Sequence, residues 1–330
     1  MILHLEVCIE RMLRRRFLPL FLLLLLVGAT AAQAADKFVA VIITGNLPRY
    51  QRSQEAFLRV LRAGGLDESK VEVYVQTPNP DPISLANSVR KAVGINADLL
   101  FTYGAQATLV ARHEGRGLPL LFADVYDPVG LGLAKTLAVP GVGISGVSDK
   151  TPTATLLRTF TDVFKGASIG ALYAPGDAGA ALQVEDLERA AAAHGLKVVR
   201  QGATSLDGVE SACTSLCSQV DALFVAESTI LELRRQQILA SAAHRGIPVI
   251  SQIPGLSDQG ALMTIEADPE EQGELAGTYA LQMLSADGRD LVLPVRTPHK
   301  VSLVINMKTA RNLHLTIPFQ ALTQATRVVK

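Results

Sequence analysis

Short apolar segments that alternate with amphipathic segments run through most of this chain, and this pattern constrains its fold more than any other feature. In the first half, four segments are rich in β-branched and apolar residues, as strands are: 37–44, 71–76, 97–103 and 118–124. Segments with apolar residues at helical spacing separate them: 50–65, 83–93 and 104–115. Such alternation predicts a parallel sheet that helices cover on both faces.

The alternation stops at residues 123–152, which are rich in Gly, Pro and small residues, and then restarts. The strand-like segments of the second half are 167–174, 196–201, 221–226, 247–252 and 260–265. The helical segments are 153–164, 179–194, 208–218, 229–244 and 269–288. We therefore expect an α/β protein with two doubly wound, Rossmann-like lobes joined by a hinge.

The positions of these segments predict where each lobe begins and ends. We expect lobe one at residues 35–145, with residues 266–290 returning to it, and lobe two at residues 146–265. The remaining segment, 291–330, belongs to neither alternating run, so we expect it to dock across the lobes. Ligands of open parallel sheets bind beyond the carboxyl ends of the strands. Two such sheets therefore suit a ligand cleft between lobes.

The first 34 residues have the three parts of a cleavable secretory signal peptide. Arginines at residues 11–16 are followed by an uncharged apolar run at residues 17–30, and Ala32-Gln33-Ala34 supplies the small residues for cleavage. The apolar run is shorter than the ~20 residues of a membrane-spanning helix. No cysteine lies at the predicted cleavage site, where a lipoprotein would carry its lipid. The sequence thus predicts a periplasmic protein that is not a lipoprotein.

Charge and composition narrow the classes of partner. Cleavage after Ala34 would remove four of the 31 basic and two of the 31 acidic residues, which leaves 27 and 29 and a net charge of −2. A nucleic-acid-binding protein needs a basic face, so no nucleic acid partner is expected. The chain has no Trp and only 5% aromatic residues, which predicts a core of Ala, Val, Leu and Ile.

Motifs that carry chemistry are weak or missing. Gly141, Gly143 and Gly146 match the dinucleotide pattern G-x-G-x-x-G, but they lie in the connection between lobes rather than between a first strand and its helix. Asp124 and Asp127 flank an aromatic residue at a strand end, where paired carboxylates could act as acid and base. No nucleophile or metal-ligand set accompanies them, which favours a polar wall or hinge. We expect no cofactor, no metal and no enzyme activity.

Cys213 and Cys217 are the two cysteines that remain after cleavage. An oxidising compartment would allow them to pair. Four residues apart on a regular helix, however, their Cβ atoms lie about 5–6 Å from each other, beyond the roughly 3.5–4.5 Å of a disulfide. A bridge would require the helix to bend or end there. Both a disulfide and two thiols on a half-buried helix face stay open.

Polar and aromatic residues gather in the turns that follow the predicted strands. In the first half they are Asn46, Tyr50, Gly104, Ala105, Gln106, Tyr126 and Asp127. In the second half they are Tyr173, Asp177, Glu227, Ser228, Thr229 and Gln252. Each also has an ordinary role in a turn or a cap. Because six such turns converge on one cleft, we expect some to contact a ligand, and the helix amides after Gly104 to be able to hold a carboxylate.

Several blocks of sequence, in this order and spacing, resemble one family. They are DLLFTYGAQAT (98–108), LPLLFADVYDPVG (118–130), GISGVSDKTP (143–152), ASIGALYAPGD (167–177), VDALFVAEST (220–229), IPVISQIPGLSDQGAL (247–262) and VSLVINMKTARNLHLTIP (301–318). The chain resembles the periplasmic substrate-binding proteins of a largely uncharacterised ABC-transporter family. Better-understood members of that family bind aromatic amino acids such as tryptophan.

The resemblance implies a hinge-bending protein with the class I periplasmic binding protein fold, which closes on a small molecule and delivers it to an ABC permease with its ATPase. Such delivery needs only a monomer, so we expect a monomer. It implies ligand contacts at Gly104 to Gln106, Asp127, Ser148, Tyr173 and Glu227 to Thr229. The chain departs from its relatives at Glu227, where they commonly have Asp. Two alternatives stay open: a sensory module for a membrane receptor, which shares this fold, and a two-domain α/β enzyme such as a racemase. Both remaining cysteines lie on one predicted helix, which argues against a racemase.

Overall fold

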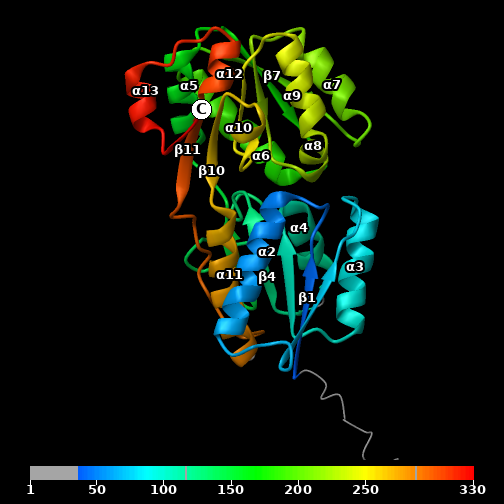
Figure 1. Ribbon diagram of the computed structural model, residues 1–330. Helices are drawn as coiled ribbons and strands as arrows, with labels where there is room; N and C mark the ends of the chain where they lie inside the picture. The colour runs from blue at the N-terminus through cyan, green and yellow to red at the C-terminus, as the bar shows by residue number, and fades with distance from the viewer. Residues whose placement is uncertain (1–35, 116, 287) are drawn as a thin grey trace, which may run out of the picture. The chain divides into compact units, whose positions relative to one another are not determined.

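The computed structural model describes residues 36–115, 117–286 and 288–330. The predicted signal peptide, residues 1–34, lies outside them. In this part of the chain, two sheets of mostly parallel strands are each covered by helices, which confirms the expected α/β fold with two Rossmann-like lobes (Figure 1). None of the described helices combines the length and the apolar character that a bilayer-spanning segment needs.

The first sheet is parallel throughout and has the order β2-β1-β3-β4-β5. Its strands are β1 (Lys37–Ile42), β2 (Val71–Gln76), β3 (Leu99–Tyr103), β4 (Leu120–Val125) and β5 (Ile144–Ser148). Its helices are α2 (Pro48–Ala63), α3 (Pro82–Gly94), α4 (Ala105–Glu114) and α11 (Pro269–Ser285). Successive side chains of a strand point to opposite faces. Val39 and Val41 accordingly pack in the core under α2 and α11, whereas Ala40 and Ile42 pack in the core under α3 and α4.

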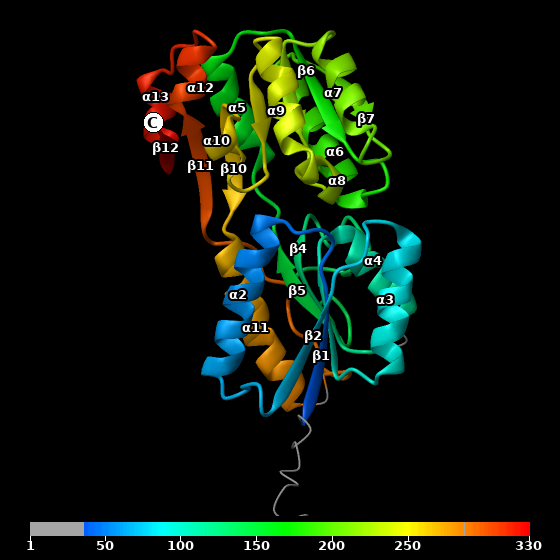
Figure 2. The ribbon, with the colours of Figure 1, turned by 45° about the vertical axis from the view of Figure 1, so that its right-hand side comes forward.

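The second sheet has the order β12-β11-β10-β9-β8-β6-β7, and only β10 and β11 pair antiparallel. Its strands are β6 (Ser168–Tyr173), β7 (Lys197–Gly202), β8 (Ala222–Val225), β9 (Val249–Ser251), β10 (Met263–Ala267), β11 (Val301–Asn306) and β12 (Arg327–Val329). The C-terminal segment therefore contributes two strands to this sheet (Figure 2).

Helices cover both faces of the second sheet as well. One core lies under α5 (Thr153–Val163), α6 (Ala178–Ala192), α12 (Met307–Asn312) and α13 (Phe319–Gln324). The other core lies under α7 (Val209–Cys217), α8 (Thr229–Leu233), α9 (Arg235–His244) and α10 (Leu256–Gln259). Aliphatic side chains dominate both cores, as the composition predicts.

The prediction of an irregular connection at residues 123–152 is wrong at one point, because β5 (Ile144–Ser148) lies there and pairs with β4. Glycine weakens the strand pattern in this segment, and the packing explains why it is needed. A Cβ atom at Gly146 would lie 2.2 Å from the carbonyl oxygen of Phe122 on β4. The glycines of the G-x-G-x-x-G match therefore lead into a close-packed strand instead of a nucleotide loop.

Two other elements differ from the sequence-based expectation. The predicted helix 229–244 is divided into α8 and α9 at Arg234, whose Nε donates to the carbonyl of Leu206 at 3.2 Å. The strand expected at 260–265 is β10 (Met263–Ala267), since Gly260, with φ +130°, ends the short α10 before it.

Two glycines bring α11 into close contact with α2. A Cβ atom at Gly273 would lie 1.9 Å from the carbonyl oxygen of Ser53, and one at Gly277 would lie 2.7 Å from Cβ of Val60. The two helices lie side by side over one face of the first sheet (Figures 1 and 2). The chain passes from β10 of the second sheet directly into α11. The contact with α2 therefore holds this returning segment on the first lobe.

We expect Gly273→Ala to lower the free energy of unfolding by about 1–3 kcal/mol, because the added methyl group must displace the Ser53 backbone. The matched control is Gly94→Ala at the end of α3, where nothing lies within 4 Å of the added Cβ atom. Alanine favours helix over glycine by up to about 1 kcal/mol, so the control should unfold no earlier than the wild type. Urea denaturation measures both. Equal stability of the two variants would contradict the close contact.

Candidate functional site

A single arginine from the first lobe is buried among carboxylates of both lobes. Arg49 lies at the start of α2, directly after Pro48, and is 4% exposed. Its Nη1 donates to the carboxylate of Asp124. Its Nη2 lies 2.7 Å from Oε1 of Glu232, and its Nη1 lies 3.9 Å from Oε1 of Glu227. The guanidinium therefore links the end of β4 to two carboxylates that follow β8.

The positions of these groups follow from where the strands end. Asp124 has a left-handed backbone with φ +59°, which is uncommon for a residue other than glycine. Its N–H donates to Oε1 of Gln272 at 3.2 Å, and Nε2 of Gln272 donates to the carbonyl of Ser148 at 2.8 Å. One amide of α11 thus holds the ends of β4 and β5 together and fixes the direction of Asp124.

Asp149 and Glu227 form an acidic pair beside the arginine. Nε2 of Gln183 donates to Oε2 of Glu227 at 2.7 Å, and the N–H of Glu227 donates to Oε1 of Gln183 at 2.8 Å. Burial, and then the nearby charge of Asp124, raises the pKa of Asp149 to about 7. Burial, and then the charge of Asp149, raises the pKa of Glu227 well above its ordinary value. Both carboxyl groups therefore bind a proton at a higher pH than an exposed carboxyl group does.

Two further carboxylates complete the cluster. Burial raises the pKa of Glu232 to about 7, although the charge of Arg49 opposes this shift. Burial also raises the pKa of Asp177, which caps α6 by accepting from the N–H groups of Gly179 at 2.9 Å and Ala180 at 3.3 Å. Buried carboxylates without matching cations are costly. Such costs are typical of functional sites.

These groups surround a cavity of about 20 Å³, enough for roughly one water molecule. Its lining comes from both lobes: Arg49, Tyr50, Gly104, Ala105, Asp124, Tyr126, Asp149, Asp177, Gly179, Ala180, Gln183 and Glu227. Two buried polar atoms at this cavity, Nε of Arg49 and Oδ1 of Asp149, have no hydrogen-bond partner. A polar ligand atom could pair with each of them.

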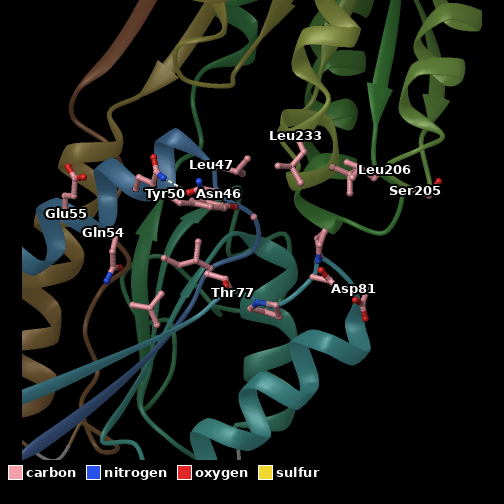
Figure 3. Close-up of a pocket in the computed structure, with 18 of the residues that line it drawn as sticks. Asn46, Leu47, Tyr50, Gln54, Glu55, Thr77, Asp81, Ser205, Leu206 and Leu233 are labelled. Carbon is pink, nitrogen blue, oxygen red and sulfur yellow. Dashed lines mark hydrogen bonds between the residues drawn. The ribbon is translucent and has the colours of Figure 1, made fainter.

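A larger groove of about 1080 Å³ lies next to the small cavity (Figure 3). Tyr50 lines both, and the groove continues past Asn46, Leu47 and Leu233. Most of its other lining residues are apolar or uncharged. Size alone would favour the groove as the ligand site. We assign the site to the small cavity, because the buried charged groups that both lobes contribute surround it.

The structure brings together six of the residues that the sequence singles out. Tyr50, Gly104, Ala105, Tyr126, Asp177 and Glu227 line the small cavity. Gly104 has φ +81°, and a Cβ atom there would lie 2.7 Å from the hydroxyl of Tyr50. This close approach leaves the first amides of α4 beside the cavity. Asn46 lines the larger groove instead.

Three other predicted residues make contacts within the protein. Thr229 shares a hydrogen bond of 2.9 Å with Thr44 of the first lobe. Nε2 of Gln252 donates to Oγ1 of Thr151 at 2.7 Å. Asp127 pairs with Lys150 at 2.5 Å. The predicted residues outside the lining of the small cavity are Asn46, Gln106, Asp127, Ser148, Tyr173, Ser228, Thr229 and Gln252. Their role as ligand contacts stays a prediction.

Four residues of this site were not predicted from the sequence: Arg49, Asp149, Gln183 and Glu232. Asp149 directly follows β5, so the rule that selects polar residues after strands would have found it had that strand been recognised. Arg49 and Glu232 lie on helices, where a charged residue ordinarily faces solvent. Gln183 lies on α6, six residues after its N-cap Asp177, and only the fold shows that it faces Glu227.

The cysteines do not belong to this site. Cys213 and Cys217 are free and buried, with 3.8 Å between their sulfur atoms. They lie on α7, in the core between that helix and the sheet. Among the described residues, no group of three or more His, Cys, Asp or Glu side chains could hold a metal ion.

The fold and this site define a class of protein: two α/β lobes whose strand ends enclose a polar cavity, as in class I periplasmic binding proteins. A sequence profile for ABC transporter substrate-binding proteins matches residues 38–329. The chain therefore belongs to that family. As a member it is the solute-binding component of an ABC transporter, with a small molecule as its ligand and a permease with its ATPase as its partners.

Individual relatives agree with this assignment. A tyrosine-binding protein of Clostridioides difficile strain R20291 is 26% identical over 273 residues, covering 81% of this chain and 78% of the relative. A conserved domain protein of Vibrio cholerae is 26% identical, with a TM-score of 0.83 over 89% of this chain and 99% of the other. An ABC domain from Streptococcus pneumonia, solved in complex with L-Trp, has a TM-score of 0.84 at 24% identity, over 89% of this chain and 100% of the other.

The buried carboxyl groups should make stability depend on pH. The pKa of Asp149 and that of Glu232 are raised to about 7 in the folded protein, against about 4 for unfolded chains. The folded state thus binds more protons between these values. The free energy of unfolding should fall as pH rises from about 4.5 to 7, by at most about 1.4 kcal/mol per pH unit for each group.

Thermal unfolding at pH 5 and pH 7.5 measures this effect. We expect Asp149→Asn to reduce the pH dependence, because the amide cannot titrate. The control is Asp207→Asn, which removes a carboxylate whose side chain is 95% exposed and should leave the dependence as in the wild type. An equal slope in the wild type and in Asp149→Asn would contradict the buried, protonated carboxyl group.

Proposed function

We propose that this chain captures an amino acid or a related small molecule in the cavity beside Arg49 and carries it to the permease in the periplasm. The observation that carries the site is the set of buried charged groups that both lobes contribute, two of whose atoms lack partners. Relatives support the ligand class, since the C. difficile relative is named for tyrosine binding.

Binding works in this proposal by hinge closure without covalent chemistry. Contacts between the lobes already converge on the site: Arg49 reaches Glu232, and Thr44 reaches Thr229. A ligand that pairs with groups of both lobes gains contacts in a closed state that an open state lacks. It therefore shifts the population toward closure by the difference between its two affinities. The cavity must open to admit any ligand larger than water.

Export completes the proposal. In this proposal a cleavable signal peptide at residues 1–34 directs the protein to the periplasm. There it acts as a monomer and carries no lipid anchor. The net charge of −2 expected after cleavage gives no basis for binding nucleic acid. Nothing in the cavity requires a cofactor, and the protein's role is carriage rather than catalysis.

A binding screen with a matched pair of variants tests the proposal. Amino acids and related compounds are screened by thermal shift, and compounds that stabilise the wild type are measured by calorimetry. We expect Gly104→Val to weaken binding at least tenfold, because a side chain there meets the hydroxyl of Tyr50 and disturbs the first turn of α4. Gly94→Ala, at an open position of α3, should bind as the wild type does.

Two results would contradict the proposal. The first is that no compound of a broad metabolite panel stabilises the protein. The second is that Gly104→Val, shown to be folded by circular dichroism, binds the same compound with unchanged affinity. Turnover of a bound compound would show that carriage is not the whole function.

A further inference from the structure

The charges around the small cavity do not balance. Arg49 is the one cation among the residues that line it. Both terminal nitrogens of this arginine are already engaged, Nη1 by Asp124 and Nη2 by Glu232. Asp124 and Glu232 together therefore offer more negative charge than the single positive charge of Arg49 can neutralise. Lys150 lies nearby, but it pairs with Asp127 at 2.5 Å and lies 3.3 Å from Asp186.

Asp149 and Glu227 are left without a cation of their own. Glu227 Oε1 is 3.9 Å from the arginine, outside hydrogen-bond distance, and its Oε2 accepts from the neutral amide of Gln183. Asp149 is 5% exposed, and no N–H or hydroxyl group donates to its Oδ1, although its carboxyl group lies within hydrogen-bonding reach of that of Glu227. The third remaining carboxylate, Asp177, is satisfied by two backbone N–H groups of α6. The deficit of positive charge is thus centred on Asp149 and Glu227.

The space between these groups fits a small cationic head. A cavity of about 20 Å³ holds roughly one water molecule, and an ammonium group is of similar size. An ammonium carries three N–H donors and no acceptor. Oδ1 of Asp149 is a buried acceptor without an N–H or hydroxyl donor, and Oε1 of Glu227 has Nη1 of Arg49 at 3.9 Å. The ring of Tyr126 lies in the same lining, with Nζ of Lys150 5.4 Å from its centroid.

We propose that the ligand carries a net positive charge and that its ammonium group lies between Asp149 and Glu227. The inference rests on the proposed function and names the chemical class of its ligand: a diamine or a basic amino acid rather than a neutral one. A neutral amino acid brings one carboxylate for each ammonium, which leaves the excess of negative charge in place. Only a ligand with more cationic than anionic groups reduces it.

Binding should also release a proton. In the empty site Asp149 and Glu227 form a hydrogen-bonded pair of carboxyl groups; burial and then the charge of Asp124 raise the pKa of Asp149, and burial and then the charge of Asp149 raise the pKa of Glu227. The incoming ammonium replaces the proton of this pair, which leaves for the solvent. Affinity for a cationic ligand should therefore rise with pH between about 5 and 7.5. The charged groups that act on the pair are Arg49 and Asp124, and Lys150, next to Asp149 in the chain, lies over the ring of Tyr126.

Calorimetry with six probes at pH 7.5 tests the inference. The cationic probes are L-lysine, L-ornithine and putrescine, and the others are L-tyrosine, L-tryptophan and L-glutamate. We expect at least one cationic probe to bind tenfold or more tightly than any of the others, with proton release seen as a heat that depends on the buffer. Asp149→Asn and Glu227→Gln should each weaken that binding at least tenfold. Asp207→Asn, which is remote and exposed, should leave it unchanged.

The outcomes separate this inference from the proposed function. If L-tyrosine or L-tryptophan binds and the cations do not, the charge inference is wrong, whereas solute binding stands. If a cation binds equally well to Asp149→Asn and Glu227→Gln, the assigned position is wrong. If none of the three cations binds, the inference is overturned, and the proposed function is judged by the broader screen.

Discussion

The burial of the Arg49 guanidinium among carboxylates is the interaction on which the arrangement of this site depends. The arginine begins α2 in one lobe, and Glu232 and Glu227 belong to the other. Removing one partner of such a buried group typically costs about 3–5 kcal/mol, because the remaining charges are then uncompensated. A contact of this kind holds the two lobes in register, and it concentrates negative charge at the place where the strands of both sheets end.

The rest of the site follows from this concentration. Burial raises the pKa of Asp149 and that of Glu232 to about 7, and the charge of Asp124 adds to both shifts while the single cation Arg49 opposes them. No N–H or hydroxyl group donates to Oδ1 of Asp149. A protein selected for stability alone would replace such groups with apolar ones. Their presence in a solute-binding protein is explained if a ligand supplies the missing charge. The same carboxylates then provide affinity when the ligand is bound and a cost when it is absent.

Much of the fold could be predicted from the sequence, because its signals are local. A strand can be recognised from an apolar run such as residues 37–44, and a helix end from a pair such as Gly64-Gly65, within a few residues of sequence. The strand β5 could not be predicted in this way. Its close contact with Phe122 on the neighbouring strand requires glycine at position 146, and glycine is uncommon in strands. The site was predictable where it follows a recognised strand, as at Gly104 and Glu227. Arg49 was not predictable, because its burial depends on Glu232 in the other lobe.

The central claim is that a small molecule occupies the cavity between Asp149 and Glu227 when the protein does its work. Native mass spectrometry of the protein purified from its native host, without denaturation or exhaustive dialysis, tests this claim most directly. We expect a bound small molecule with a net positive charge on the wild type, and its loss from an Asp149→Asn, Glu227→Gln double variant. The same molecule at the same occupancy on both proteins would contradict it.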